Sequence, residues 1–102
     1  MNVRGMSMRD AGILDGDILV VDRALPPEQA AIIVATLTGA FVGKQIMFIR
    51  ERVILKSAHP HYPAFTVRPH MGYTFFGVVT FVIHPLHAFA KARLQELRSR
   101  KT

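Results

Sequence analysis

The apolar segments of this chain are short, and each is followed by residues that form turns. Pro26-Pro27, Thr38-Gly39-Ala40 and Arg50-Glu51-Arg52 interrupt the apolar pattern, and a proline-pinned loop covers residues 57–63. Several short strands joined by brief turns are typical of an all-β sheet assembly. We therefore predict a mostly β fold, with strands over residues 18–22, 30–37, 41–49, 53–56, 65–67 and 73–84.

Proline and glycine positions refine this prediction. Pro26 and Pro27 cannot donate hydrogen bonds to a neighbouring strand, so residues 23–29 are expected to form a loop. Residues 38–40 are expected to form a hairpin-like turn. Gly77 lies inside the last and longest predicted strand, where a glycine indicates a β-bulge or a close approach of two backbones.

The C-terminal segment has a different period. Pro85 suits the first position of a helix, and the apolar residues that follow recur at three- and four-residue steps, which predicts an amphipathic helix over residues 86–98. These apolar residues are Leu86, Phe89, Ala90, Leu94 and Leu97. Arg93 interrupts the apolar stripe. The helix is expected either to pack on the sheet or to contact a partner, and it divides the chain into residues 1–84 and 85–102.

Composition limits the class of protein. A chain of 102 residues is expected to form one domain with a modest core. The sequence contains no cysteine, which excludes disulfides, thiolate metal sites and cysteine catalysis, and fits a reducing cytoplasm. Residues 1–10 contain no apolar core of a signal peptide. No apolar run approaches the ~18 residues that a membrane-spanning helix needs, so we expect no membrane partner.

The net charge of +6 is concentrated at one end of the chain. From Lys91 onward there are five basic residues against Glu96 alone, whereas the first 90 residues carry eight basic and six acidic side chains. A basic tail can bind nucleic acid or an acidic protein surface. It is also what a solvated helix end looks like when its cations complement the helix dipole.

Ser7 and Lys44 are the candidate catalytic residues. Ser7 follows a Gly5 turn, and Lys44 stands 37 residues later in an apolar predicted strand. A serine hydroxyl becomes a nucleophile when a base takes its proton, and burial can lower the pKa of a lysine by ~3–5 units so that it serves as that base. Val42 and Ile46 share the strand face of Lys44, and no acidic residue lies within six positions. The alternatives are an edge lysine that extends into solvent and an ordinary turn serine.

Other kinds of site have little support in the sequence. His59 and His61 could share a face, but no nearby carboxylate or cysteine completes a zinc site. The phosphate-binding, dinucleotide-binding and zinc-peptidase motifs are not found. There is no helix-turn-helix, and aromatic residues do not interleave with the basic tail. We therefore expect no metal, no cofactor and weak or no direct binding to DNA.

Four segments resemble one family in their order along the chain. They are the turn Gly5-Met6-Ser7-Met8 with Lys44 downstream, the Asp-Gly-Asp turn and strand at residues 15–22, the loop His59-Pro60-His61-Tyr62-Pro63, and the closing strand at residues 76–83. This set resembles the LexA/UmuD family of self-cleaving Ser-Lys peptidases over roughly residues 3–84. Within the family, the body is most similar to the UmuD branch in its processed form.

The resemblance implies a role for each residue of the site. Ser7 would be the nucleophile and Lys44 the neutral general base. The backbone N–H groups of Met6 and Ser7 would form the oxyanion hole. Met8 would line the substrate cleft, although ordinary core packing is the alternative for this side chain. The acidic residues of the Asp15-Gly16-Asp17 turn are expected to shape the turn rather than to act in catalysis.

The resemblance also implies a function. The fold would be a Ser-Lys peptidase domain of short, strongly bent sheets with an appended C-terminal helix. Such a chain would be a homodimeric, cytoplasmic accessory subunit of an error-prone Y-family translesion polymerase in the SOS response to DNA damage. RecA filaments would trigger cleavage of the uncleaved form. The first alternative is the dimerisation and autocleavage domain of a phage or SOS repressor; others are a stand-alone peptidase and a catalytically idle interaction module.

Three features depart from the family pattern. Only six residues precede Ser7, so the arm with the Ala-Gly or Cys-Gly bond that family members cut is expected to be missing, and the dyad would act only in trans. Gly43 stands where an apolar residue usually precedes the lysine, which is expected to loosen that strand. Residues 85–102 extend beyond the usual end of the domain.

Overall fold

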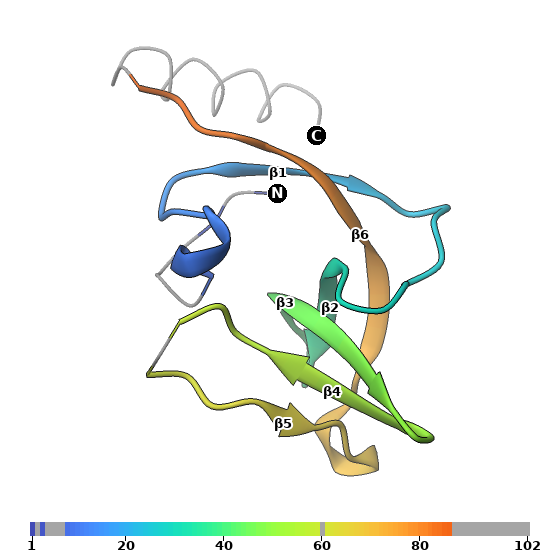
Figure 1. Cartoon of the computed structure of the whole chain (residues 1–102). Coiled ribbons are helices and arrows are strands. Elements are labelled where there is room, and N and C mark those ends of the chain that lie inside the picture. The colour runs from blue at the N-terminus through green and yellow to red at the C-terminus, as the bar shows by residue number, and fades with distance from the viewer. Residues whose placement is uncertain (2, 4–7, 60, 87–102) are drawn as a thin grey trace.

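The described part of the chain is one bent antiparallel sheet. The computed structural model describes residues 1, 3, 8–59 and 61–86, and Figure 1 shows six strands in the order β1-β6-β2-β3-β4-β5. The strands are β1 (Ile18–Asp22), β2 (Ile32–Leu37), β3 (Ala40–Ile49), β4 (Arg52–Lys56), β5 (Phe65–Thr66) and β6 (Thr74–Ile83), with short 3-10 helices η1 (Arg9–Ala11) and η2 (Pro69–Met71). The prediction of a mostly β fold is confirmed.

The curvature of the sheet is concentrated along β6, the long curved strand of Figure 1. Its register shifts against β1 between Val20 and Val21, and against β2 between Val34 and Ala35. Such irregularities bend a strand and increase its twist. Gly77 lies at the second shift, and a Cβ atom there would be 2.6 Å from Val21 Cγ1 and 2.9 Å from the backbone carbonyl oxygen of Asp22. The close backbone approach predicted at Gly77 is therefore present.

Hydrophobic side chains are buried on both faces of β2. Ile33, Val34 and Ala35 have no exposed surface. Because side chains alternate along a strand, Val34 points to the face opposite Ile33 and Ala35. One face holds the cluster Met8, Ile13, Leu19 and Val34, and the other holds Ile33, Ala35, Ile46 and Leu55. Two small cores therefore lie on either side of the same central strand.

Local backbone conformation explains where the strands differ from the predicted ranges. β2 begins at Ile32 rather than at residue 30 because Ala30 adopts a left-handed conformation with φ of 66°. The predicted turn between β2 and β3 is a two-residue connection in which Thr38 and Gly39 both have positive φ, as tight hairpins require. The two 3-10 helices η1 and η2 were not predicted from the sequence. Beyond Leu86, the predicted helix over residues 86–98 lies outside the described residues.

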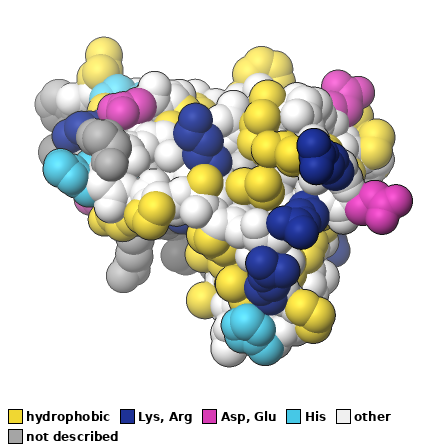
Figure 2. Space-filling view, turned by 60° about the horizontal axis from the view of Figure 1, so that its bottom comes forward, with side chains coloured by type: hydrophobic (Ala, Val, Ile, Leu, Met, Phe, Trp, Pro, Cys, Tyr) yellow, Lys and Arg dark blue, Asp and Glu magenta, His cyan; other side chains and the backbone are white. Residues whose placement is uncertain are grey.

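Exposed cations of the body gather at the β4–β5 side. Figure 2, which brings the bottom of Figure 1 forward, shows Lys and Arg side chains among hydrophobic ones. The exposed cations of this region are Arg50, Arg52, Lys56 and Arg68. The Val67 N–H donates to the carbonyl of Val53, which extends the β4–β5 ladder. Although the charges of the first 90 residues nearly cancel, these four cations make the β4–β5 side of the sheet basic.

No helix among the described residues is long and apolar enough to cross a membrane.

Two strand glycines make a matched test of the packing. A Cβ atom on Gly43 would only touch Leu19 Cδ1 at 3.9 Å, whereas on Gly77 it would overlap Val21. We expect Gly43→Ala to raise the free energy of unfolding by about 0.4–1 kcal/mol because it restricts the unfolded chain. We expect Gly77→Ala to lower it by about 1–3 kcal/mol through overpacking. Urea denaturation measures both, and similar effects at the two sites would contradict this packing.

Candidate active site

Lys44 lies near the middle of β3, on a largely buried face. It pairs with the fully buried Ile33 of β2, and Val42 and Ile46 flank it on its own face. Lys44 forms no ion pair with any described residue. Loss of solvent around the ammonium group lowers the pKa of Lys44 below the ordinary lysine value. This environment favours the neutral amine that a general base requires.

Ser57 is the hydrogen-bond partner of Lys44. The lysine Nζ donates to Ser57 Oγ at 2.5 Å, and Ser57 is only 4% exposed. Gln45 pairs with Lys56 in the β3–β4 ladder, so the next position of the register brings Lys44 opposite Ser57. Sequence reasoning missed Ser57. Counting outward from the predicted three-residue turn Arg50-Glu51-Arg52 would have placed Lys44 opposite Ala58, whereas the structure pairs Ile49 with Arg52 and so brings Ser57 opposite Lys44.

The chain that follows Ser7 is fastened beside Ser57. The backbone N–H of Ala58 donates to Met8 Sδ at 3.3 Å, and the N–H of Asp10 donates to the carbonyl of Ala58 at 2.7 Å. These two hydrogen bonds therefore tie Met8 and Asp10 to Ala58, the neighbour of Ser57. Ser7 and Met6 lie outside the described residues, so their assignment as nucleophile and oxyanion hole stays a prediction.

Met8 itself is 4% exposed and belongs to the core cluster with Ile13, Leu19 and Val34. This is the packing that ordinary core formation predicts for a methionine. Its proposed place in a substrate cleft stays a prediction.

The Asp-Gly-Asp turn is held together by Asp17. This carboxylate is 1% exposed, and its Oδ2 accepts a hydrogen bond from the Leu14 N–H at 2.8 Å. Its Oδ1 contacts Nδ1 of His84, which follows β6. On the backbone, the Val3 N–H donates to the Asp17 carbonyl and the Gly16 N–H donates to the Val3 carbonyl, both at 2.8 Å. Asp17 therefore shapes the turn, as expected from the sequence.

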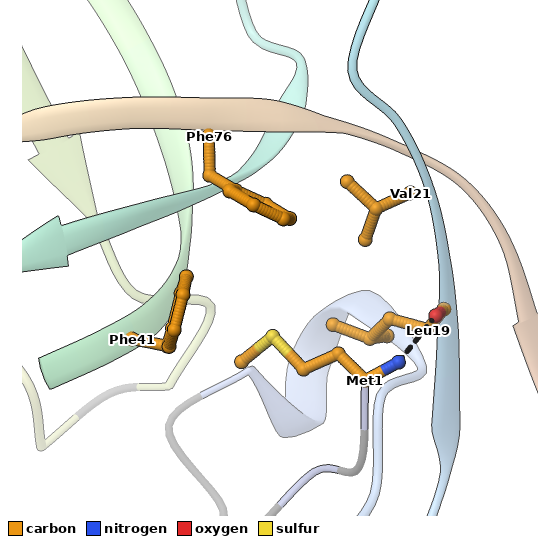
Figure 3. A pocket seen from close by; sticks show the side chains of 5 residues that line it. All are labelled: Met1, Leu19, Val21, Phe41 and Phe76. Carbon is orange, nitrogen blue, oxygen red and sulfur yellow. Dashed lines mark hydrogen bonds between the residues drawn. The ribbon is translucent and has the colours of Figure 1, made fainter. Parts of the chain in front are cut away.

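An apolar cavity of about 320 Å³ lies beside β3, lined by Met1, Leu19, Val21, Phe41 and Phe76 (Figure 3). Phe41 and Phe76 meet edge to face with ring centroids 5.2 Å apart, and the Arg23 guanidinium lies 4.2 Å from the Phe76 centroid. Strand alternation places Phe41 on the face of β3 opposite Lys44. The lining suits an apolar side chain and lies apart from the lysine amine.

The histidines of the loop after β4 pack with an aromatic residue. The rings of His59 and His61 are 5.3 Å apart, and Tyr62 meets His59 edge to face at 4.9 Å. Within the described ranges, no group of three His, Cys, Asp or Glu side chains could hold a metal ion.

Comparison with known proteins identifies the family. Residues 1–80 match the Peptidase S24-like family model. The chain belongs to this peptidase family. The relatives include LexA repressors and the ImpA proteins, so the predicted LexA/UmuD kinship is confirmed.

Three relatives show the extent of the similarity to this S24-like chain. The LexA repressor of Delftia acidovorans is 37% identical over 83 residues, which are 81% of this chain and 37% of that protein. Protein ImpA of Salmonella typhimurium is 38% identical over 84 residues, which are 82% of this chain and 57% of that protein. The LexA repressor of Bordetella avium is 37% identical over 89 residues. This chain spans less than two thirds of the length of each of these relatives.

The lowered pKa of Lys44 predicts a specific pH dependence of stability. Between that pKa and the ordinary value of 10.5, the unfolded S24-like chain binds a proton that the folded chain has lost. The free energy of unfolding should therefore rise with pH in this window, relative to Lys44→Met, which has no amine to titrate. Below this window, the difference in the free energy of unfolding between the wild type and Lys44→Met should not change with pH.

Urea denaturation at several pH values measures this difference, and the Ser57 hydroxyl adds no titration there. A difference that does not change with pH, or that falls as pH rises, would show that the folded environment does not depress the pKa of Lys44.

Proposed function

We propose that this S24-like chain is a UmuD-like accessory subunit of an error-prone Y-family translesion polymerase, acting in the SOS response to DNA damage. In this proposal it is a cytoplasmic homodimer with weak or no direct binding to DNA. Residues 1–84 form the peptidase domain, and residues 85–102 form a basic helical tail. RecA filaments would act on the uncleaved form of the protein. The similarity to ImpA over 82% of this chain supports this branch of the family.

The peptidase chemistry that we propose uses Ser7 and Lys44. Neutral Lys44 takes the Ser7 proton as Ser7 Oγ bonds to the carbonyl carbon of an Ala-Gly or Cys-Gly bond. Backbone N–H groups of Met6 and Ser7 stabilise the oxyanion. The lysine ammonium then gives its proton to the leaving amine, and water releases the acyl group from Ser7.

The observation that carries this proposal is the environment of Lys44. Its amine is partly desolvated, its pKa is lowered, and its hydrogen-bond partner in the described part of the chain is the neutral Ser57 hydroxyl. Lys44 is half-buried between the half-buried Val42 and the buried Ile46 on one face of β3, an apolar setting that suits a neutral amine better than an ammonium group. The hydrogen bonds from the Ala58 N–H to Met8 Sδ and from the Asp10 N–H to the Ala58 carbonyl support a position of Ser7 near this amine.

A repressor fragment is the second candidate function. LexA repressors match this chain over 81–85% of its length, with 37% identity. The chain would then be the dimerisation and autocleavage domain of a phage or SOS repressor. The same dyad chemistry applies to both candidates, so the peptidase test and the partner test are separate.

The peptidase test supplies the scissile arm on another protein. The substrate is a full-length ImpA-type relative whose own nucleophilic serine is replaced by alanine, so that only this chain can cut it. We expect cleavage by the wild type to rise with pH as Lys44 loses its proton. Ser7→Ala and Lys44→Ala should each lower the rate at least about a hundredfold, which is the scale of general-base catalysis.

Mass spectrometry of the products identifies the cleaved bond. Circular dichroism of both variants serves as the folding control. Full activity in folded Lys44→Ala would remove the lysine from the mechanism, and full activity in Ser7→Ala would remove the proposed nucleophile.

The partner test is co-purification with the translesion polymerase encoded by the same source, using the wild type and Ser7→Ala. We expect both proteins to bind, because the proposed contact does not require the nucleophile. A folded chain that does not bind the polymerase would shift the assignment to the repressor domain.

A further inference from the structure

We propose that Ser57 is a positioning residue that fixes the Lys44 amine for catalysis. This inference rests on the proposed Ser7–Lys44 mechanism. Lysine carries its amine on a flexible four-carbon stem, so a buried lysine that acts as a base needs something to hold its end. In this structure the Ser57 hydroxyl, 2.5 Å from Lys44 Nζ, is placed to do so.

The backbone makes Ser57 a rigid support. It directly follows β4, and the β3–β4 register brings it opposite Lys44. Its neighbour Ala58 is held by two hydrogen bonds, one to Met8 Sδ and one from the Asp10 N–H. Ser57 therefore joins the strand that carries the base to the segment that follows the nucleophile.

Burial argues against Ser57 as a nucleophile. The residue is 4% exposed, whereas an attacking hydroxyl must reach the carbonyl carbon of a bound peptide. Lys44 is half-buried and therefore more exposed than Ser57. The burial of Ser57 therefore fits a residue that holds the Lys44 amine and does not fit a residue that attacks the substrate.

The remaining neighbours of Lys44 on its face are uncharged. They are Ile33 and Ala35 from β2, Val42 and Ile46 from β3, and Leu55 from β4. None of them titrates or forms hydrogen bonds through its side chain. Among the described residues, Ser57 is therefore the polar group that acts on this amine.

The hydrogen-bond direction suits a base. When neutral Lys44 donates one N–H to Ser57 Oγ, the lone pair of its nitrogen stays free to accept the proton of Ser7. The same bond stabilises the ammonium form more than the neutral form, since hydrogen bonds from charged donors are stronger. Removing the acceptor should therefore misplace the amine and also make its ammonium form less favourable.

The sharpest test compares Ser57→Thr with Ser57→Val, two side chains of nearly the same shape that differ in the hydroxyl. Trans cleavage of the serine-to-alanine ImpA-type substrate is measured across pH. We expect Ser57→Thr to keep most of the wild-type kcat. We expect Ser57→Val to lower kcat by about ten- to a hundredfold with little change in KM, as for a misplaced catalytic group.

The pH profile separates positioning from a loss of folded protein. With Ser57→Val, the rising limb should move to lower pH while its plateau falls. A variant that is merely less folded would lower the plateau without moving the limb. An unchanged kcat in Ser57→Val, or an unmoved limb, would overturn the inference.

A second measurement does not depend on peptidase activity. NMR titration of the Lys44 side chain, assigned by its absence in Lys44→Met, should give a lower pKa in Ser57→Val than in Ser57→Thr. Equal pKa values would contradict the role of Ser57 even if the dyad proves inactive. Cleavage that survives in Lys44→Ala would instead refute the proposed mechanism, and cleavage lost in Ser57→Thr but kept in Ser7→Ala would make Ser57 the nucleophile and overturn the inference.

Discussion

The burial of β2 on both of its faces is the constraint on which the rest of the structure depends. Ile33, Val34 and Ala35 are fully buried, and β2 pairs with β6 along one edge and with β3 along the other. Full burial of a valine or isoleucine side chain contributes roughly 1.5–3 kcal/mol. A slip of one residue would exchange the side chains between the two cores. The register of β3 against β2 is therefore fixed, and with it the position of Lys44 opposite Ile33.

The register of β3 against β2 and that of β4 against β3 together determine the geometry of the candidate site. The two-residue Thr38–Gly39 turn sets β3 against β2, and the Arg50–Glu51 turn sets β4 against β3. Thr38 and Gly39 in the first turn and Arg50 in the second have positive φ, which matches the twist of a tight hairpin. Ser57 reaches Lys44 through the single β3–β4 hairpin, without any long loop to position it. Local turn chemistry thus determines a contact between residues 13 positions apart.

Much of this arrangement could be predicted from the sequence. Strand-length apolar runs and turn residues indicated the β fold, and Gly77 indicated the close approach to β1. The apolar face around Lys44 indicated its desolvation. Ala30 was misjudged because nothing in its side chain signals a positive φ. Ser57 was missed because a serine at a strand end is a common turn residue, and its importance depends on a register that only the paired strands define.

A serine beside Lys44 suits the general-base role that we propose for this lysine. A carboxylate at that position would hold the amine equally well, but its charge would favour the ammonium form and raise the pKa. An apolar residue would keep the pKa low and leave the long side chain without a fixed end. A buried neutral hydroxyl positions the amine while adding no charge. The described structure combines this acceptor with an apolar face and no ion pair to Lys44, a combination that suits an amine held in place and able to lose its proton, as the proposed mechanism requires.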